Sequence, residues 1–184
     1  MNQWPDRQLF NALTADDSSA LSVLFLRHYD HLMHYGMQTG ADRTLVEGSI
    51  QELFIYIFQS SGCFDEIIMV RAYLFKSIRR RVLEKIRAER KLKSSRKKWF
   101  YHIDLQFSPS DLAVQKNQLR TTNESLSNAL NILPWRQREA IYLRYYNGLN
   151  TREIAEIMGV ANQTVLNTLC QALKKLRTSN ISKA

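Results

Sequence analysis

Residues 151–177, TREIAEIMGVANQTVLNTLCQALKKLR, decide the fold of the C-terminal part of the chain. Thr151 is a suitable N-cap for a short helix that ends at Gly159, and a turn then leads into a longer helix. Ala155 lies four residues before Gly159 and Val165 lies six residues after it, as a tight helix-turn-helix requires. This spacing favours DNA binding over an ordinary αα-hairpin. The positions expected to face inward are Ile154, Ala155, Met158, Val165, Leu169, Ala172, Leu173 and Leu176.

The second of these helices carries polar side chains where DNA would be read. In a helix-turn-helix, the N-terminal half of the second helix enters the major groove. Amide side chains suit bidentate contacts to adenine, threonine can meet a thymine methyl group or a phosphate, and Lys174 would meet phosphates. Because this helix has few charges, its non-specific affinity for DNA is expected to be modest. The candidate reading residues are Asn162, Gln163, Thr164, Asn167, Thr168, Gln171 and Lys174.

Outward from this motif, the chain shows helical rather than strand periodicity. Apolar residues recur every four positions from Val70 to Ile86, which predicts a long helix. Pro134 is expected in the first turn of a helix that ends at Gly148, and Gly36 is expected to mark a break between helices.

Residues 94–110 interrupt the helical pattern. They have no sustained period, so we expect a flexible linker there. The aromatic residues of this stretch suggest that it packs against something; they are Trp99, Phe100, Tyr101 and Phe107. The sequence therefore predicts an all-α protein of two small helical domains, residues 1–93 and 111–184, with the helix-turn-helix in the second.

The net charge of +9 is unevenly distributed. Residues 1–70 carry three basic and nine acidic side chains, residues 71–98 carry thirteen and two, and residues 99–184 carry ten and six. An acidic first part and a strongly basic middle indicate two kinds of partner, although basic runs also occur as solvated faces.

Several classes of protein are excluded by composition and motifs. The two cysteines, Cys63 and Cys170, are far apart, so neither a disulfide framework nor a zinc ribbon is expected. The longest apolar run, residues 53–58, is too short for membrane insertion, and without a secretory signal we expect a cytoplasmic protein. The spacing of His28, His31 and His34 does not favour a metal site. With no catalytic motif, we expect neither a cofactor nor enzyme activity.

Taken together, these features resemble an extracytoplasmic-function (ECF) sigma factor of bacterial RNA polymerase. Four segments in the same order as in that family carry the resemblance: ALSVLFLRHYDHLMHYGMQTGAD, IQELFIYIFQ, VRAYLFKSIRRRVLEKIRAERK and NALNILPWRQREAIYLRYYNGLNTREIAEIMGVANQTVLNTLCQALKKLR. The resemblance implies that residues 1–93 form region 2, which binds core polymerase and melts and reads the −10 element. It implies that residues 111–184 form region 4, which reads the −35 element.

The resemblance also implies partners and site residues. Core RNA polymerase would be bound through its β′ coiled coil and its β flap, and an anti-sigma factor is left open as a further partner. The β′ coiled coil would be gripped by Gln51, Glu52, Leu53 and Phe54. Opened −10 DNA would be held by Arg71, Tyr73, Lys76, Arg79, Arg80 and Arg81, with Tyr73 and Phe75 either stacking on bases or lying in the core. Asn167, Cys170 and Gln171 occupy positions that read the −35 element.

Some residues depart from the family pattern and leave the promoter sequence open. Gly48 stands where an acidic residue is usual, and Arg80 where asparagine is frequent. Basic residues are common at the positions of Leu166, Thr168 and Gln171. A packing role is favoured for Cys170 over a redox-sensitive contact. Two other functions remain open: a helix-turn-helix regulator that works without polymerase, and an adaptor or anti-sigma-like protein that does not read DNA.

Overall fold

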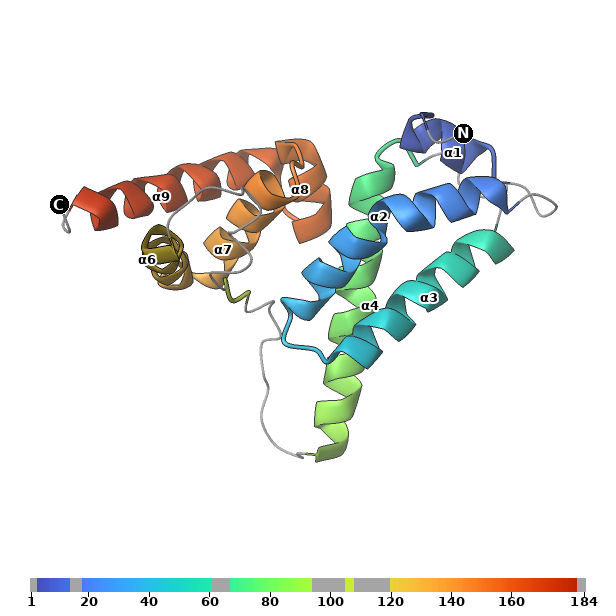
Figure 1. The fold of residues 1–184 in the computed structure, drawn as a ribbon, viewed down its shortest axis with the longest axis horizontal. Coiled ribbons are helices and arrows are strands. Elements are labelled where there is room, and N and C mark those ends of the chain that lie inside the picture. The colour runs from blue at the N-terminus through green and yellow to red at the C-terminus, as the bar shows by residue number, and fades with distance from the viewer. Residues whose placement is uncertain (1–2, 14–17, 61–66, 94–104, 108–119, 182–184) are drawn as a thin grey trace. The chain divides into compact units, whose positions relative to one another are not determined.

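The computed structural model of the chain describes residues 3–13, 18–60, 67–93, 105–107 and 120–181. All regular structure within these residues is helical, which confirms the predicted all-α fold (Figure 1). The chain divides into two compact units: the first comprises residues 1–101 and 156–158, and the second comprises residues 102–155 and 159–184. The main boundary between the units follows residue 101. That point lies inside the predicted linker, most of which falls outside the described residues, so its flexibility and the predicted domain limits stay predictions.

The first unit is built from helices α1 to α4. The bounds of these helices are Asp6–Asn11, Ser19–Met37, Arg43–Gln59 and Val70–Lys93. Helices α2, α3 and α4 contact one another, and α1 contacts both α2 and α4. The four-residue apolar repeat of α4 is buried along its length, as the sequence predicts: Val70, Leu74, Ile78, Val82 and Ile86.

Gly36 does not break a helix, contrary to the prediction, because it lies inside α2. A Cβ atom at this position would clash with the side chain of Val46 in α3. The glycine therefore serves the close approach of two helices rather than a turn.

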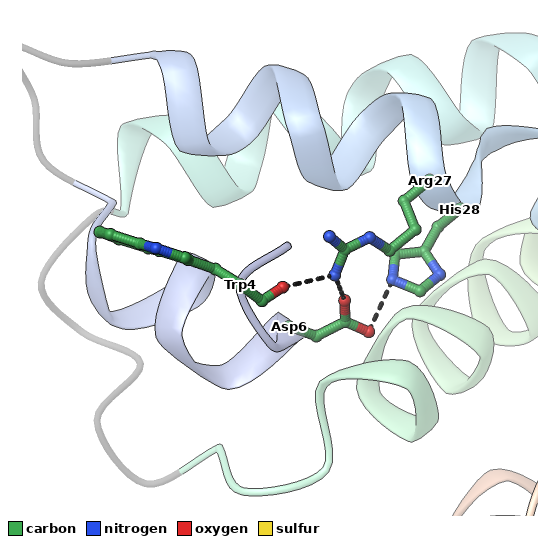
Figure 2. Close-up of polar contacts among 4 residues, drawn as sticks. All are labelled: Trp4, Asp6, Arg27 and His28. Atoms are coloured by element: carbon green, nitrogen blue, oxygen red, sulfur yellow. Dashed lines mark hydrogen bonds and ion pairs between the residues drawn. The ribbon is translucent and has the colours of Figure 1, made fainter. Parts of the chain in front are cut away.

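Helix α1 is held on α2 by a cluster of polar contacts (Figure 2). The Asp6 carboxylate accepts a hydrogen bond from Arg27 and lies 2.8 Å from Nε2 of His28. Nη1 of Arg27 also donates to the carbonyl oxygen of Trp4 at 2.9 Å. Burial raises the pKa of the Asp6 carboxyl, but His28 and Arg27 outweigh this effect and hold the pKa below its ordinary value. His28 is thus a buried histidine with a carboxylate partner.

The second unit contains five helices within the described residues. They are α6 (Arg120–Asn131), α7 (Trp135–Ile141), the π-helix η1 (Tyr142–Tyr146), α8 (Thr151–Met158) and α9 (Asn162–Ile181). Pro134 occupies the N-cap of α7, one residue before the predicted first turn. Gly148 has φ of 64° and follows η1, which agrees with its predicted place after a helix end. The sequence did not predict the π-helix, whose Asn147 amide donates to the Tyr142 carbonyl oxygen at 3.2 Å.

Residues 105–107, the part of the predicted linker that the structure describes, belong to the second unit. Leu105 is fully buried and Phe107 is 6% exposed. Both backbone polar groups of Phe107 are bound by α6 side chains: its amide donates to Oδ1 of Asn131 at 2.8 Å, and its carbonyl oxygen accepts from Ser127 and Asn131. The Phe107 ring also lies 6.0 Å from that of Tyr142. The expectation of packing is confirmed for Phe107, whereas Trp99, Phe100 and Tyr101 lie outside the described residues.

Candidate nucleic-acid interface

Helix α8 begins with a capping box whose N-cap is Asn150, one residue before the predicted N-cap Thr151. The side chain of Asn150, not Thr151, accepts from the backbone amides of Arg152 and Glu153, both at 3.0 Å. Oε2 of Glu153 accepts from the Asn150 amide in return at 2.8 Å. At the other end Gly159 adopts the left-handed conformation, with φ of 66°. The short helix and its turn are therefore fixed at both ends, as a helix-turn-helix needs.

Helix α9 buries one side and exposes the side predicted to read DNA. Val165, Leu169 and Ala172 are buried, as expected. Three expectations were wrong: Leu173 is 44% exposed, and Met158 of α8 and Leu176 of α9 are only half-buried. The exposed predicted reading residues are Asn162, Gln163, Thr164, Asn167, Cys170, Gln171 and Lys174, while Thr168 is half-buried and donates to the Thr164 carbonyl oxygen.

Five of the exposed residues lie on one face of α9 because their spacing follows the helical repeat: Gln163, Asn167, Cys170, Gln171 and Lys174. We call these five residues the reading face. Nε2 of Gln163 donates to Oδ1 of Asn167 at 3.2 Å, and Nε2 of Gln137 in α7 donates to Oε1 of Gln171 at 3.3 Å. The exposure of Cys170 contradicts its interpretation as a packing cysteine.

The six residues predicted to hold −10 DNA do not share one face of α4. Lys76 and Arg80 are exposed, whereas Arg71, Tyr73, Arg79 and Arg81 are half-buried. Arg71 and Arg80 are nine residues apart, which places them about 180° from each other around the helix axis. The six residues therefore divide between two sides of α4, and their contact with −10 DNA stays a prediction.

The two aromatic residues of α4 differ in exposure. Phe75 is fully buried and its ring lies 5.2 Å from that of Tyr35, so it is a core residue and not a platform for bases. Tyr73 is half-buried, and the ring of Phe10 in α1 contacts it edge-on at 5.9 Å. Burial, together with the nearby Tyr56, raises the pKa of Tyr73. Only Tyr73 keeps surface that a base could touch.

The predicted polymerase-binding residues of α3 also separate by exposure. Gln51 and Glu52 are exposed, but Leu53 and Phe54 are buried, and Phe54 packs edge-on against Phe25 at 5.1 Å. Leu53 and Phe54 thus belong to the core of the first unit.

The sequence analysis missed the exposed apolar residues Ile55, Tyr56 and Phe58, which lie one turn or more beyond Gln51 and Glu52. The signal was available, since the positions three and four residues after an exposed residue of a helix share its face. We call the five residues Gln51, Glu52, Ile55, Tyr56 and Phe58 the α3 surface.

Within the part of the chain that the structure describes, no helix is long and apolar enough to cross a bilayer. The same described residues contain no group of three or more histidine, cysteine or acidic side chains arranged to hold a metal ion.

Residues 123–176, which contain the capped helix-turn-helix, match the family model of sigma-70 region 4. Two curated relatives extend this match. The chain is 33% identical over 97 residues to the RNA polymerase sigma factor SigV of Bacillus subtilis (strain 168), an alignment that spans 44% of this chain and 58% of SigV. It is 24% identical over 168 residues to the ECF RNA polymerase sigma factor SigL of Mycobacterium tuberculosis, covering 89% and 90% of the two chains.

Solved structures share the fold of the whole chain. One is CnrH in complex with the cytosolic domain of CnrY, with a TM-score of 0.61, 21% identity and coverage of 97% and 99%. Another is the sigma factor RpoE in complex with the anti-sigma factor NepR from Bartonella quintana, with a TM-score of 0.60, 21% identity and coverage of 86% and 94%. Over most of its length the chain is thus similar to an ECF sigma factor, in agreement with the resemblance drawn from its sequence.

Proposed function

We propose that this alternative sigma factor binds core RNA polymerase and directs it to promoters, where α9 reads the −35 duplex and α4 holds the opened −10 strand. The observation that carries the proposal is the reading face of α9, which is presented by a helix-turn-helix fixed by the Asn150 capping box and Gly159. Amides on this face suit adenine, and Lys174 suits a phosphate.

The −10 strand is held by the exposed side of α4. Lys76 and Arg80 neutralise phosphates there, and Tyr73 offers the edge of a ring to an unstacked base. The match to sigma-70 region 4 does not extend to this helix, so its role rests on charge, exposure and the resemblance of its sequence to region 2.

Core polymerase is bound by the α3 surface. Glu52 supplies negative charge and Ile55, Tyr56 and Phe58 supply apolar area, a combination that fits the basic coiled coil of the β′ subunit. The second unit contacts the β flap, and an anti-sigma factor is a further partner, as it is for RpoE bound to NepR. We place this action in the cytoplasm and assign no catalytic activity to the chain itself.

The test is transcription with purified core polymerase and this protein on promoter fragments from its own genome. We expect promoter-dependent transcripts and co-elution of the chain with core. Glu52→Lys should abolish co-elution while the helical circular dichroism is retained, because Glu52 is exposed. Asp30→Lys, an equal charge reversal at an exposed position of α2, is the control and should co-elute.

The proposal fails if the wild-type chain gives neither transcripts nor co-elution. Sequence-specific duplex binding by the chain alone, without co-elution, would instead indicate a regulator that works without polymerase. Loss of co-elution in both variants would show that net charge, and not the α3 surface, governs the association.

A further inference from the structure

A hydrogen bond connects α7 to the reading face of α9. Nε2 of Gln137 in α7 donates to Oε1 of Gln171 in α9 at 3.3 Å, where the two helices pack against each other. Gln137 is 7% exposed, whereas Gln171 is exposed to solvent. The bond therefore runs from a buried donor to a residue that is proposed to read DNA. Gln137 is not among the site residues predicted from the sequence.

Burial ties the Gln137 amide to this bond. Its Oε1 atom is buried and has no hydrogen-bond partner among the described residues. The bond to Gln171 is thus the one hydrogen bond of the Gln137 side chain within the part of the chain that the structure describes. If Gln171 turned away, a buried NH₂ group would lose its acceptor, and buried donors without an acceptor are costly.

The bond engages the oxygen end of the Gln171 amide. A bidentate contact to adenine needs both ends, because the oxygen accepts from N6 while the nitrogen donates to N7. Since Oε1 of Gln171 already accepts from Gln137, N6 of adenine would have to share it. The NH₂ group of Gln171, which only donates, is the end left for DNA. Guanine presents two adjacent acceptors in the major groove, O6 and N7, and therefore suits this group best.

We propose that Gln137 is a positioning residue for −35 recognition, which holds the oxygen of Gln171 so that the NH₂ group of Gln171 donates to guanine. This inference rests on the proposed function. It adds a residue behind the reading face and the identity of one base of the −35 element. It also separates Gln171 from the other amides of the reading face, which suit adenine.

The other amide pair of the reading face has no buried member. Nε2 of Gln163 donates to Oδ1 of Asn167 at 3.2 Å, but both side chains are exposed. Water can replace either partner there, so both amides can turn toward a base at little cost. Asn167 thus keeps both ends of its amide available for adenine, whereas Gln171 has one end engaged by a buried neighbour.

The first test identifies the base that Gln171 reads. The holoenzyme selects −35 sequences from a randomised pool, with wild type and Gln171→Ala in parallel. The position of Gln171 is exposed, so the variant should keep its fold. We expect one position of the −35 element to lose its base preference in the variant, and guanine to be the base that wild type prefers there. Any other preferred base at that position, or no position that depends on Gln171, would overturn the inference.

The second test removes the positioning group. Gln137→Met keeps a side chain of similar length and removes a buried oxygen without a partner, so the helical circular dichroism should be retained. At the position that depends on Gln171, the preference for guanine over adenine should fall about three- to tenfold, which corresponds to one hydrogen bond. The reason is that the released oxygen can accept from N6 of adenine. Preferences at the other positions should stay the same, and Gln137→Met should have no effect in the Gln171→Ala background.

Gln106→Met is the matched control, because Gln106 is an exposed glutamine of the same unit within residues 105–107. It should leave the guanine preference unchanged. An equal loss of preference at every position in Gln137→Met would make Gln137 a structural residue and overturn its positioning role. An effect of Gln137→Met that persists without Gln171 would overturn it as well.

Failure of the proposed function gives a different result from failure of this inference. Absence of co-elution with core, or a pool in which no −35 sequence is enriched, would overturn the proposed function. Normal enrichment with an unchanged guanine preference in Gln137→Met would overturn the role of Gln137 alone.

Discussion

Helices α4 and α9 are proposed to bind the same promoter, but they differ in charge and in the contacts that stabilise them. Residues 71–98, which include all of α4 except its first residue, contain thirteen basic and two acidic side chains, whereas the reading face of α9 has Lys174 as its single charge. Charge supplies affinity for any strand, while amides in the major groove supply discrimination among bases. Under the proposed function, the first unit therefore supplies strength of DNA binding and the second unit supplies base reading.

The two helices also differ in the packing contacts that hold them in place. Helix α4 packs through its apolar repeat against α1, α2 and α3. The unit that carries α9 also depends on a short extended segment, residues 105–107, whose Phe107 is bound by α6 side chains and contacts Tyr142. Variants that alter either the packing or the charge of one unit should separate the two helices experimentally.

The largest effect is expected from Phe107→Ala, which removes the buried ring at the edge of the second unit. Loss of a buried phenylalanine destabilises a protein by about 3–5 kcal/mol. Hydrogen exchange should therefore accelerate in peptides from α6 to α9 and remain unchanged in peptides from α2 to α4. Tyr145→Ala is the control in the same unit, since Tyr145 is 62% exposed and its loss should have little effect. If hydrogen exchange accelerated equally in both units, α9 would not be stabilised independently of the first unit.

The next effect concerns the charge of α4. The double variant Lys76→Gln/Arg80→Gln should lower holoenzyme affinity for promoter DNA about tenfold or more, equally for different promoter sequences. The salt dependence should become shallower by about 1.4, or about 0.7 for each lost contact with a single strand. Fluorescence anisotropy at several salt concentrations measures both quantities. A sequence-dependent loss would show that α4 reads bases as well.

Asn167→Ala in α9 should instead cause a loss of affinity that depends on the DNA sequence and leaves the salt dependence unchanged. A bidentate amide contact to adenine contributes about 1–3 kcal/mol of discrimination, so binding to the preferred −35 sequence should weaken while binding to other sequences changes little. The salt slope should stay the same because no charge is lost. Selection of −35 sequences from a randomised pool, with wild type in parallel, measures the loss of preference. A uniform loss with a changed slope would make α9 a phosphate-binding helix.

Much of this arrangement could be predicted from sequence because helical periodicity is local. The four-residue repeat of α4 and the spacing around Gly159 gave the buried faces of both units. The same periodicity separates the buried Leu53 and Phe54 from the exposed α3 surface, and it places Arg71 and Arg80 on different sides of α4. A family motif lists consecutive residues, which on a helix point in different directions.

Other features depend on contacts that no local pattern encodes. The Phe107 backbone meets side chains of α6 twenty or more residues later. The role of Gly36 depends on Val46 in a neighbouring helix, and the hydrogen bond to the Gln171 oxygen depends on Gln137 in α7. Such contacts follow from how helices pack, so sequence periodicity could predict the elements but not these partners.

The smallest effect is expected at the polar cluster that attaches α1 to the unit of α4. Asp6→Asn removes the carboxylate that pairs with Arg27 and His28, and at pH 7 it should lower the free energy of unfolding of the first unit by about 1–2 kcal/mol. Because the pKa of folded Asp6 lies below its ordinary value, the carboxylate stabilises the fold above the pKa of the unfolded chain. This contribution is lost as the pH falls through the folded pKa, so the stabilities of wild type and variant should converge in strongly acidic solution.

Urea unfolding at pH 7, 5, 4 and 3 measures the difference, with Asp30→Asn on the exposed side of α2 as the control. A difference between Asp6→Asn and wild type that stays constant down to pH 3 would show that hydrogen bonding, and not the charge of Asp6, attaches α1.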